Sequence, residues 1–138
     1  MRTCLPALAL LLAGCGDAPS PRIITPALTI DQVAWTAADL VKPIAVRPLR
    51  SDADSTAMLI RLDGAERPHV HAEHDLVVVL RSGRGVIHLD GRSHEIGPGD
   101  VMEIPRGVVH WAESDGGPCE VYAVFTGTYD GSDVIPVR

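Results

Sequence analysis

Aromatic residues are scarce in this chain of 138 residues, which contains one Phe, two Trp and two Tyr. A site that binds a flavonoid or a sugar by stacking needs aromatic side chains, so the composition disfavours such ligands. Positive charge is also scarce, because 12 Lys and Arg stand against 18 Asp and Glu, and the net charge is −6. The basic residues form no run, so we expect neither a nucleic-acid partner nor a basic membrane-binding patch.

Long hydrophobic runs are missing as well. The apolar run over residues 5–12 follows Arg2 and is too short to cross a bilayer as a helix. It ends in the sequence L-A-G-C, which resembles a bacterial lipobox, with cleavage before Cys15. The resemblance implies a lipoprotein signal peptide over residues 1–14 and a lipid on Cys15. The alternative is an ordinary secretory signal with an incidental cysteine.

The residue after Cys15 bears on location. In this class of lipoproteins, a residue other than Asp at that position favours the outer membrane, and here it is Gly16. We therefore expect a bacterial envelope protein held by a lipid anchor and facing the periplasm. Cys4 would leave with the signal and Cys15 would carry lipid, which leaves Cys119 without a partner. We expect no disulfide in the mature chain, and a buried thiol at Cys119.

The domain organisation follows from turns and short apolar segments. Residues 15–30 are rich in Pro and small residues and are expected to form a flexible tether, with a single domain over 31–138. Residues 31–41 have helical spacing, with Thr29 or Asp31 as the cap, Trp35 as an anchor and Pro43 beyond the end. This predicts a short helix outside the main fold.

The rest of the domain is predicted to be all-β. Thirteen Gly and eleven Pro punctuate short apolar runs, and Asp90-Gly91 is typical of a type I′ hairpin turn. Many short strands at even spacing favour a sandwich or a small barrel. The predicted strands cover residues 44–49, 56–62, 76–80, 85–89, 101–104, 108–111 and 120–126.

Three histidines indicate a metal site. His69 and His71 are two residues apart, so on a strand both side chains lie on one face. Two neutral imidazoles on one face can share a divalent metal such as Zn, Cu, Fe or Ni. His110 lies far along the chain, and a barrel or sandwich would return it to the same place. His88 and His94, beside the Asp90-Gly91 turn, are expected to be solvated strand residues.

These residues resemble the two motifs of the cupin superfamily across residues 56–126. The resemblance implies a cupin double-stranded β-helix, which is a jelly-roll barrel. It also implies a divalent transition metal (Fe, Mn, Ni, Cu or Zn) on His69, His71 and His110. The first motif matches at Gly64, His69, His71, an acidic position near Asp75, and Gly83; the second matches at Gly99, Pro105, Gly107 and His110, with Ser114 in place of the usual Asn.

The fourth ligand stays open between alternatives. The family spacing counted from His71 indicates Asp75, whereas the spacing counted back from Gly83 falls on Leu76, which cannot bind a metal. His74, three residues after His71, is the other candidate. A site with three protein ligands is the remaining possibility, and it would leave coordination positions for water or substrate.

Two functions fit these observations. The first is an envelope-anchored metalloenzyme, a dioxygenase or isomerase acting on a small organic substrate. The second is a lipoprotein that binds a metal or small ligand without catalysis. Arg67 offers a charge for an anionic ligand, although a surface role explains it equally well. Cupins often pair through edge strands, so a homodimer is a further expectation.

Overall fold

The structure is a computed structural model that describes residues 19–138. The predicted signal peptide over residues 1–14 and the predicted lipid on Cys15 lie outside the described residues. Within the described range the chain forms twelve strands and one short helix. No helix among these residues is long and apolar enough to span a membrane. The all-β class expected from the sequence is confirmed.

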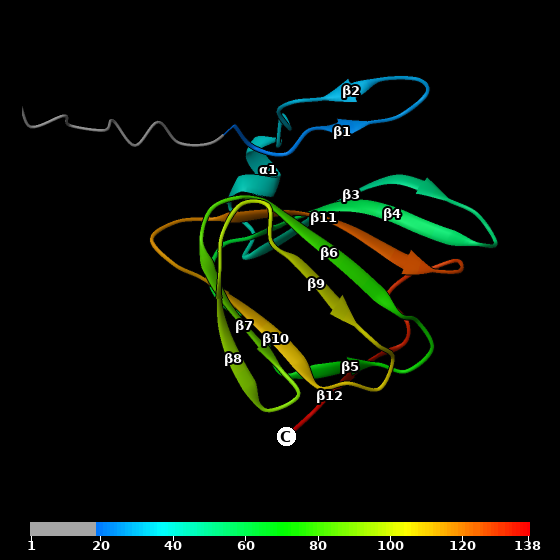
Figure 1. The fold of residues 1–138 in the computed structure, drawn as a ribbon, viewed down its shortest axis with the longest axis vertical. Coiled ribbons are helices and arrows are strands. Elements are labelled where there is room, and N and C mark those ends of the chain that lie inside the picture. The colour runs from blue at the N-terminus through cyan, green and yellow to red at the C-terminus, as the bar shows by residue number, and fades with distance from the viewer. Residues whose placement is uncertain (1–18) are drawn as a thin grey trace, which may run out of the picture.

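Two five-stranded antiparallel sheets face each other and enclose the core (Figure 1). The first has the order β3-β4-β11-β6-β9 and the second the order β12-β5-β10-β7-β8. The first sheet consists of β3 (Ile44–Ser51), β4 (Ser55–Leu62), β11 (Cys119–Thr126), β6 (Leu76–Ser82) and β9 (Val101–Ile104). The second consists of β12 (Val134–Pro136), β5 (His69–His71), β10 (His110–Ser114), β7 (Gly85–Leu89) and β8 (Arg92–Ile96).

Alternating side chains build the core between the sheets. On β6, Leu76, Val78 and Leu80 are buried and Val77 is exposed, as expected of a strand with one face inside. Residues from both sheets meet in one cluster that fills the barrel interior. Its buried members are Met58, Leu76, Val78, Ile87, Met102, Ile104, Ala123 and Phe125.

Turn chemistry sets the strand boundaries. Asp90 and Gly91 both have positive φ, at 49° and 78°, and Leu89 pairs with Arg92 across the turn, as a type I′ hairpin requires. The strand predicted over 108–111 begins two residues later, at His110. The reason is a turn, in which the Val108 amide donates to the Pro105 carbonyl and the Gly107 amide donates to the carbonyl of His71.

The predicted helix is much shorter than expected. Helix α1 covers only Ala37–Leu40, and its cap is Thr36, which forms a capping box with Asp39. Thr29 and Asp31 do not cap it, because Thr29 belongs to strand β2 and the helix begins only at Ala37, six residues after Asp31. Trp35 does contact the barrel, since its Nε1 donates to the Glu120 carboxylate at 2.8 Å.

The part of the predicted tether that is described is folded onto the barrel. Strands β1 (Ile23–Ile24) and β2 (Thr29–Ile30) form a hairpin outside the first sheet (Figure 1). The Arg81 guanidinium, on a side chain only 2% exposed, donates to the carbonyls of Pro21, Ile30 and Asp31 and pairs with Glu120. A buried arginine with these partners fixes this segment, which composition alone would leave flexible.

Candidate metal centre

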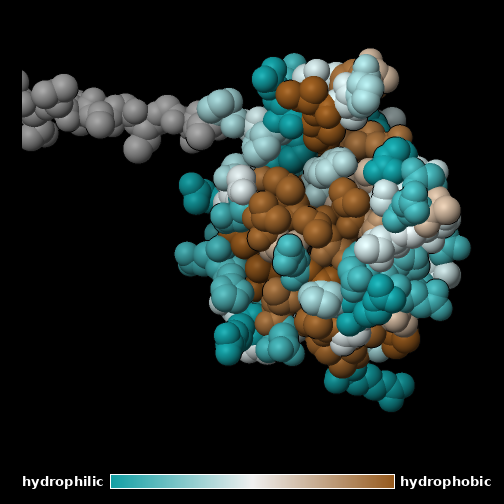
Figure 2. All heavy atoms as spheres, turned by 45° about the vertical axis from the view of Figure 1, so that its right-hand side comes forward, coloured by the Kyte–Doolittle hydropathy of each residue, from teal (hydrophilic) through white to brown (hydrophobic). Residues whose placement is uncertain are grey.

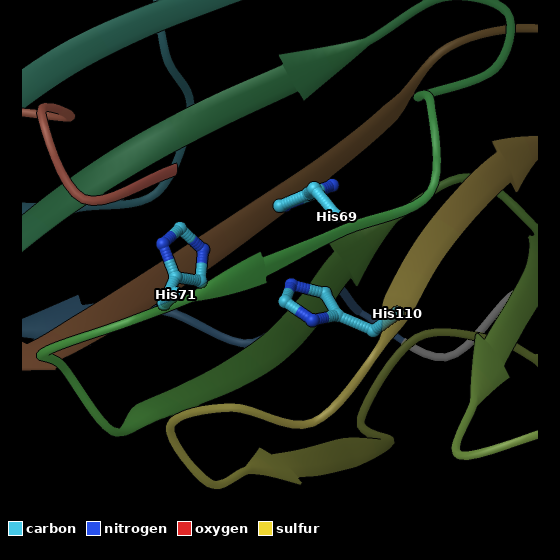
Figure 3. A group of neighbouring side chains, drawn as sticks. All are labelled: His69, His71 and His110. Carbon is cyan, nitrogen blue, oxygen red and sulfur yellow. The ribbon is translucent and has the colours of Figure 1, made fainter. Parts of the chain in front are cut away.

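Three histidines come together at the junction of two strands. His69 and His71 lie on one face of β5, and His110, the first residue of β10, is paired with His69 across the antiparallel ladder. Figure 3 shows the three rings extending into a common space. One ring nitrogen from each residue lies within 4.8 Å of the others. The structure therefore brings together the three histidines that the sequence singled out.

Each imidazole has one nitrogen engaged with an acceptor. The Nδ1 atom of His69 lies 2.8 Å from the Arg67 carbonyl, and that of His110 lies 3.0 Å from the Val108 carbonyl. The Nδ1 atom of His71 lies 3.3 Å from a carboxylate oxygen of Asp133. These acceptors assign the proton to Nδ1 and leave Nε2 of each ring free to bind a metal.

Burial favours the neutral rings that a metal requires. His71 and His110 are 5% and 3% exposed. Burial lowers the pKa of His110 to about 4 and also lowers that of His71, although the Asp133 carboxylate opposes the latter shift. Both imidazoles are therefore neutral near pH 7 and present lone pairs rather than protons.

Asp133 is a functional residue that sequence reasoning missed. Its side chain is 1% exposed and contacts Nδ1 of both His71 and His74, the latter at 2.7 Å. It also accepts the Glu73 amide at 3.1 Å. Burial alone would raise the pKa of Asp133, but these hydrogen bonds outweigh it and hold the pKa at about 2. Asp133 lies in a loop 62 positions after His71 and orients the His71 ring. Neither of the two sequence motifs includes Asp133.

The two candidates for a fourth ligand lie elsewhere. Both nitrogens of His74 have partners, since Nδ1 contacts Asp133 and Nε2 lies 3.1 Å from the Thr128 carbonyl. Asp75 forms a two-pronged ion pair with Arg106, which lowers its pKa to about 2. Neither residue belongs to the histidine group. Of the open alternatives, the arrangement matches the site with three protein ligands.

A carboxyl group that the motifs did not indicate lies beside this group. Glu66 is three residues before His69, on the side of the H-x-H pair opposite to the expected ligand. One of its oxygens accepts the Ala112 amide at 2.9 Å, and burial raises the pKa of the carboxyl. Among the described residues no partner is found for the other oxygen. A half-buried carboxyl with one free oxygen can exchange a proton with a bound molecule.

An open cavity of about 650 Å³ gives access to the site. It lies between the edge strands β3 and β12, and His69, His71 and Glu66 line it. Tyr129 contributes a phenol whose pKa burial raises to about 12, and its ring stacks on Phe125 with 3.6 Å between centroids. Figure 2 shows hydrophobic side chains gathered over a broad area of one face, with hydrophilic ones around it.

The remaining singled-out residues lie away from the centre. His88 stacks on Trp111 with ring centroids 4.3 Å apart and contacts Ser93 and Glu113, so it belongs to a cross-strand cluster and not to a metal site. His94 is exposed on β8. Cys119 is a buried free cysteine whose thiol donates to the Arg84 carbonyl, as expected of a structural thiol.

Comparison with known proteins agrees with this architecture. The family model for the cupin domain matches residues 58–125. The chain belongs to the cupin family. An uncharacterized protein of Aquifex aeolicus is 33% identical to this cupin over 98 residues, which cover 71% of this chain and 81% of that protein. The predicted family and jelly-roll fold are confirmed.

Other relatives have stated activities or solved structures. An acireductone dioxygenase of Gluconacetobacter diazotrophicus is 36% identical over 76 residues, which cover 48% of this chain and 42% of that enzyme. The structure of KdgF from Halomonas sp. has a TM-score of 0.61 at 25% identity, covering 65% of this chain and 84% of that one. Pac13 of Streptomyces, described as a nucleoside dehydratase, has a TM-score of 0.60 at 15% identity, covering 87% and 86%. At that identity the likeness to Pac13 concerns the fold alone.

Proposed function

We propose that this cupin is a metal-dependent enzyme, a dioxygenase or isomerase of a small organic molecule. The observation that carries the proposal is the convergence of His69, His71 and His110, each with Nδ1 engaged and Nε2 free. Neutral imidazole nitrogens suit Fe, Mn, Ni, Cu and Zn, so one divalent transition metal is the group that this donor set fits. When bound, such an ion supplies Lewis acidity or, for a redox-active metal, activation of O2.

The chain's own residues supply the remaining functions. Three protein ligands leave coordination positions open to a substrate, as catalytic metal sites require. The free carboxyl oxygen of Glu66, which lines the cavity, can pass a proton to or from a bound molecule. The apolar side chains of β3 and β12 exclude water from one side of that molecule.

Two further observations support an enzyme over a non-catalytic binding protein. A closed site of four protein ligands would suit storage or sensing, but His74 and Asp75 are both engaged with other residues. The relative from Gluconacetobacter diazotrophicus is an acireductone dioxygenase, which is a property of that protein and supports the oxygenase class here.

The location is part of the proposal. The sequence L-A-G-C ending at Cys15 supports a lipid anchor in the bacterial envelope, with the barrel facing the periplasm. Cells grown with labelled palmitate should incorporate the label into the wild-type protein and not into Cys15→Ser. Equal labelling of both would contradict the anchor and leave the metal site unaffected.

Turnover tests the enzymatic part. The purified protein is loaded separately with Fe(II), Mn(II), Ni(II), Cu(II) or Zn(II), and O2 uptake and product formation are measured on a panel of small substrates that includes an acireductone. We expect turnover with at least one metal and its loss in His110→Ala. Metal-loaded protein that is inactive on every substrate would contradict catalysis and favour the non-catalytic lipoprotein.

A further inference from the structure

The entrance of the cavity is lined by exposed hydrophobic side chains. Strands β3 and β12 are the edge strands of the two sheets, and Ile44, Val46 and Val134 from them line the cavity. These three side chains are 40%, 49% and 38% exposed. Apolar side chains that remain exposed around a concave site are typical of ligand-binding grooves.

One cation lines the same cavity without a partner. Among the Lys and Arg side chains of the described residues, none of the ion pairs involves Arg67; they engage Arg22, Lys42, Arg50, Arg61, Arg81 and Arg106. The Arg67 guanidinium also forms no hydrogen bond within residues 19–138, although its backbone carbonyl contacts His69. Arg67 is an exposed residue of the segment directly before β5. A guanidinium that lines a pocket and is free of protein partners is suited to a carboxylate, which it binds through two parallel hydrogen bonds.

The charges around the cavity favour an anion over a cation. The acidic residues that line it are Glu66 and Asp130. Glu66 lies in the interior and accepts the Ala112 amide, and Asp130 is exposed and accepts the Ser132 amide. Asp133, behind His71, is a third carboxylate and contacts both His71 and His74. All three carboxylates thus already have partners within the protein. A divalent metal on the three histidines and the Arg67 guanidinium would be the positive groups left to meet a ligand.

We infer that the cavity binds a small amphipathic carboxylate, with its head group between Arg67 and the histidine centre and its apolar part against Ile44, Val46 and Val134. The volume of about 650 Å³ suits a molecule of this size. The inference rests on the proposed function, which supplies the metal, and it names the class of substrate. The inferred ligand has both an anionic head and an apolar tail, so the contribution of each part to binding can be tested separately.

The test titrates straight-chain carboxylates of six, eight and ten carbons into the purified protein by calorimetry, with 1-octanol as the uncharged match for octanoate. Metal content is measured on the same samples, and both Zn(II)-loaded and metal-free protein are used. We expect affinity to rise about two- to fourfold per methylene, since a fully buried methylene contributes about 0.8 kcal/mol. Octanoate should bind at least about tenfold more tightly than octanol.

Variants separate the two parts of the site. Arg67→Gln should weaken octanoate binding about tenfold without changing octanol binding. Arg67→Lys should restore part of the octanoate affinity. Arg92→Gln, at an exposed arginine on β8, should change the affinity for neither ligand. Val46→Ser should flatten the chain-length dependence, whereas Val101→Ser, at a valine that is 61% exposed on β9 and outside the cavity lining, should not.

The outcomes distinguish this inference from the proposed function. Zn(II)-loaded protein that binds octanol as well as octanoate, or binds neither, would overturn the inference while the metal site stands. Sedimentation showing a dimer that Val46→Ser dissociates, without carboxylate binding, would also overturn it and assign the apolar entrance to a second copy. Protein that takes up no metal but binds octanoate through Arg67 would support the inference and contradict the proposed enzyme.

Discussion

The single residue with the most consequence for the histidine centre is Asp133, which belongs to neither metal-binding motif. It orients His71 through Nδ1 and is itself fixed by His74 and the amide of Glu73. Carboxylates in this position hold the ring and raise the basicity of the ligating nitrogen. The second nitrogen of His71 is therefore a better metal ligand than that of a free imidazole.

Asp133→Asn should weaken metal binding about 10- to 100-fold, because the amide lacks the negative charge that polarises the His71 ring. Competition with a chromophoric chelator measures the dissociation constant. Asp130→Asn is the matched control, since Asp130 is exposed and contacts Ser132 instead of a histidine. Equal affinity of Asp133→Asn and wild type would show that Asp133 has no influence on the ligand.

His110 makes the stability of the metal-free protein depend on pH. Its pKa is about 4 in the fold and about 6.5 when unfolded. Between these values the unfolded chain binds a proton that the folded chain does not, so the free energy of unfolding falls as pH drops from 6.5 to 4. The full shift corresponds to about 3 kcal/mol.

Urea unfolding at pH 7 and pH 4.5, with metal removed by a chelator, measures this fall. His110→Gln cannot titrate, so its stability should fall less over the same range. The remaining fall reports other groups, including His71, whose pKa is also lowered. A variant with the same pH dependence as wild type would refute the assignment to His110.

At the scale of elements, the N-terminal hairpin is held to the barrel by Arg81. Its guanidinium is buried and bonds three backbone carbonyls as well as Glu120. Arg81→Ala leaves the half-buried carboxylate of Glu120 without this partner and releases the hairpin. Because a broken buried ion pair leaves an uncompensated charge, we expect a loss of about 3 kcal/mol of unfolding free energy.

Denaturant unfolding and hydrogen exchange check this expectation together. In Arg81→Ala the amides of β1 and β2 should exchange faster, while those of β11 should stay protected. Arg50→Ala removes an exposed pair with Asp52 and should cost less than about 1 kcal/mol. If both variants were equally stable, Arg81 would not be the anchor.

The strands were predictable where their own side chains determine them. Residues 85–89 and 101–104 form strands as predicted, because apolar residues lie between strong turn signals. Strand β8, with the sequence Arg92–Ile96, has little apolar content, and its pairing across Asp90-Gly91 forms it. The helix over 31–41 was wrong in extent, because residues 29–31 are engaged with β1 and Arg81. For β8 a neighbouring strand determined the structure, and for the helix a contact with the distant Arg81 did.

For the molecule as a whole, the three histidine ligands of the site could be predicted from the sequence, whereas the residues around them could not. Strand parity places His69 and His71 on one face, and the cupin motif adds His110. Asp133 could not be found, because its contact with His71 joins residues 62 positions apart without a motif. Glu66 precedes the H-x-H pair, where the motif offers no carboxylate, and its role emerges only from the cavity.

Metal content tests the central claim most directly. Wild-type protein, His71→Ala, His94→Ala and Asp75→Asn are purified in parallel, reconstituted with Zn(II) and analysed by mass spectrometry. We predict one metal ion per chain in wild type, His94→Ala and Asp75→Asn, and less than about a tenth of that in His71→Ala. Retention of a full equivalent by His71→Ala, or its loss in Asp75→Asn, would contradict the three-histidine centre.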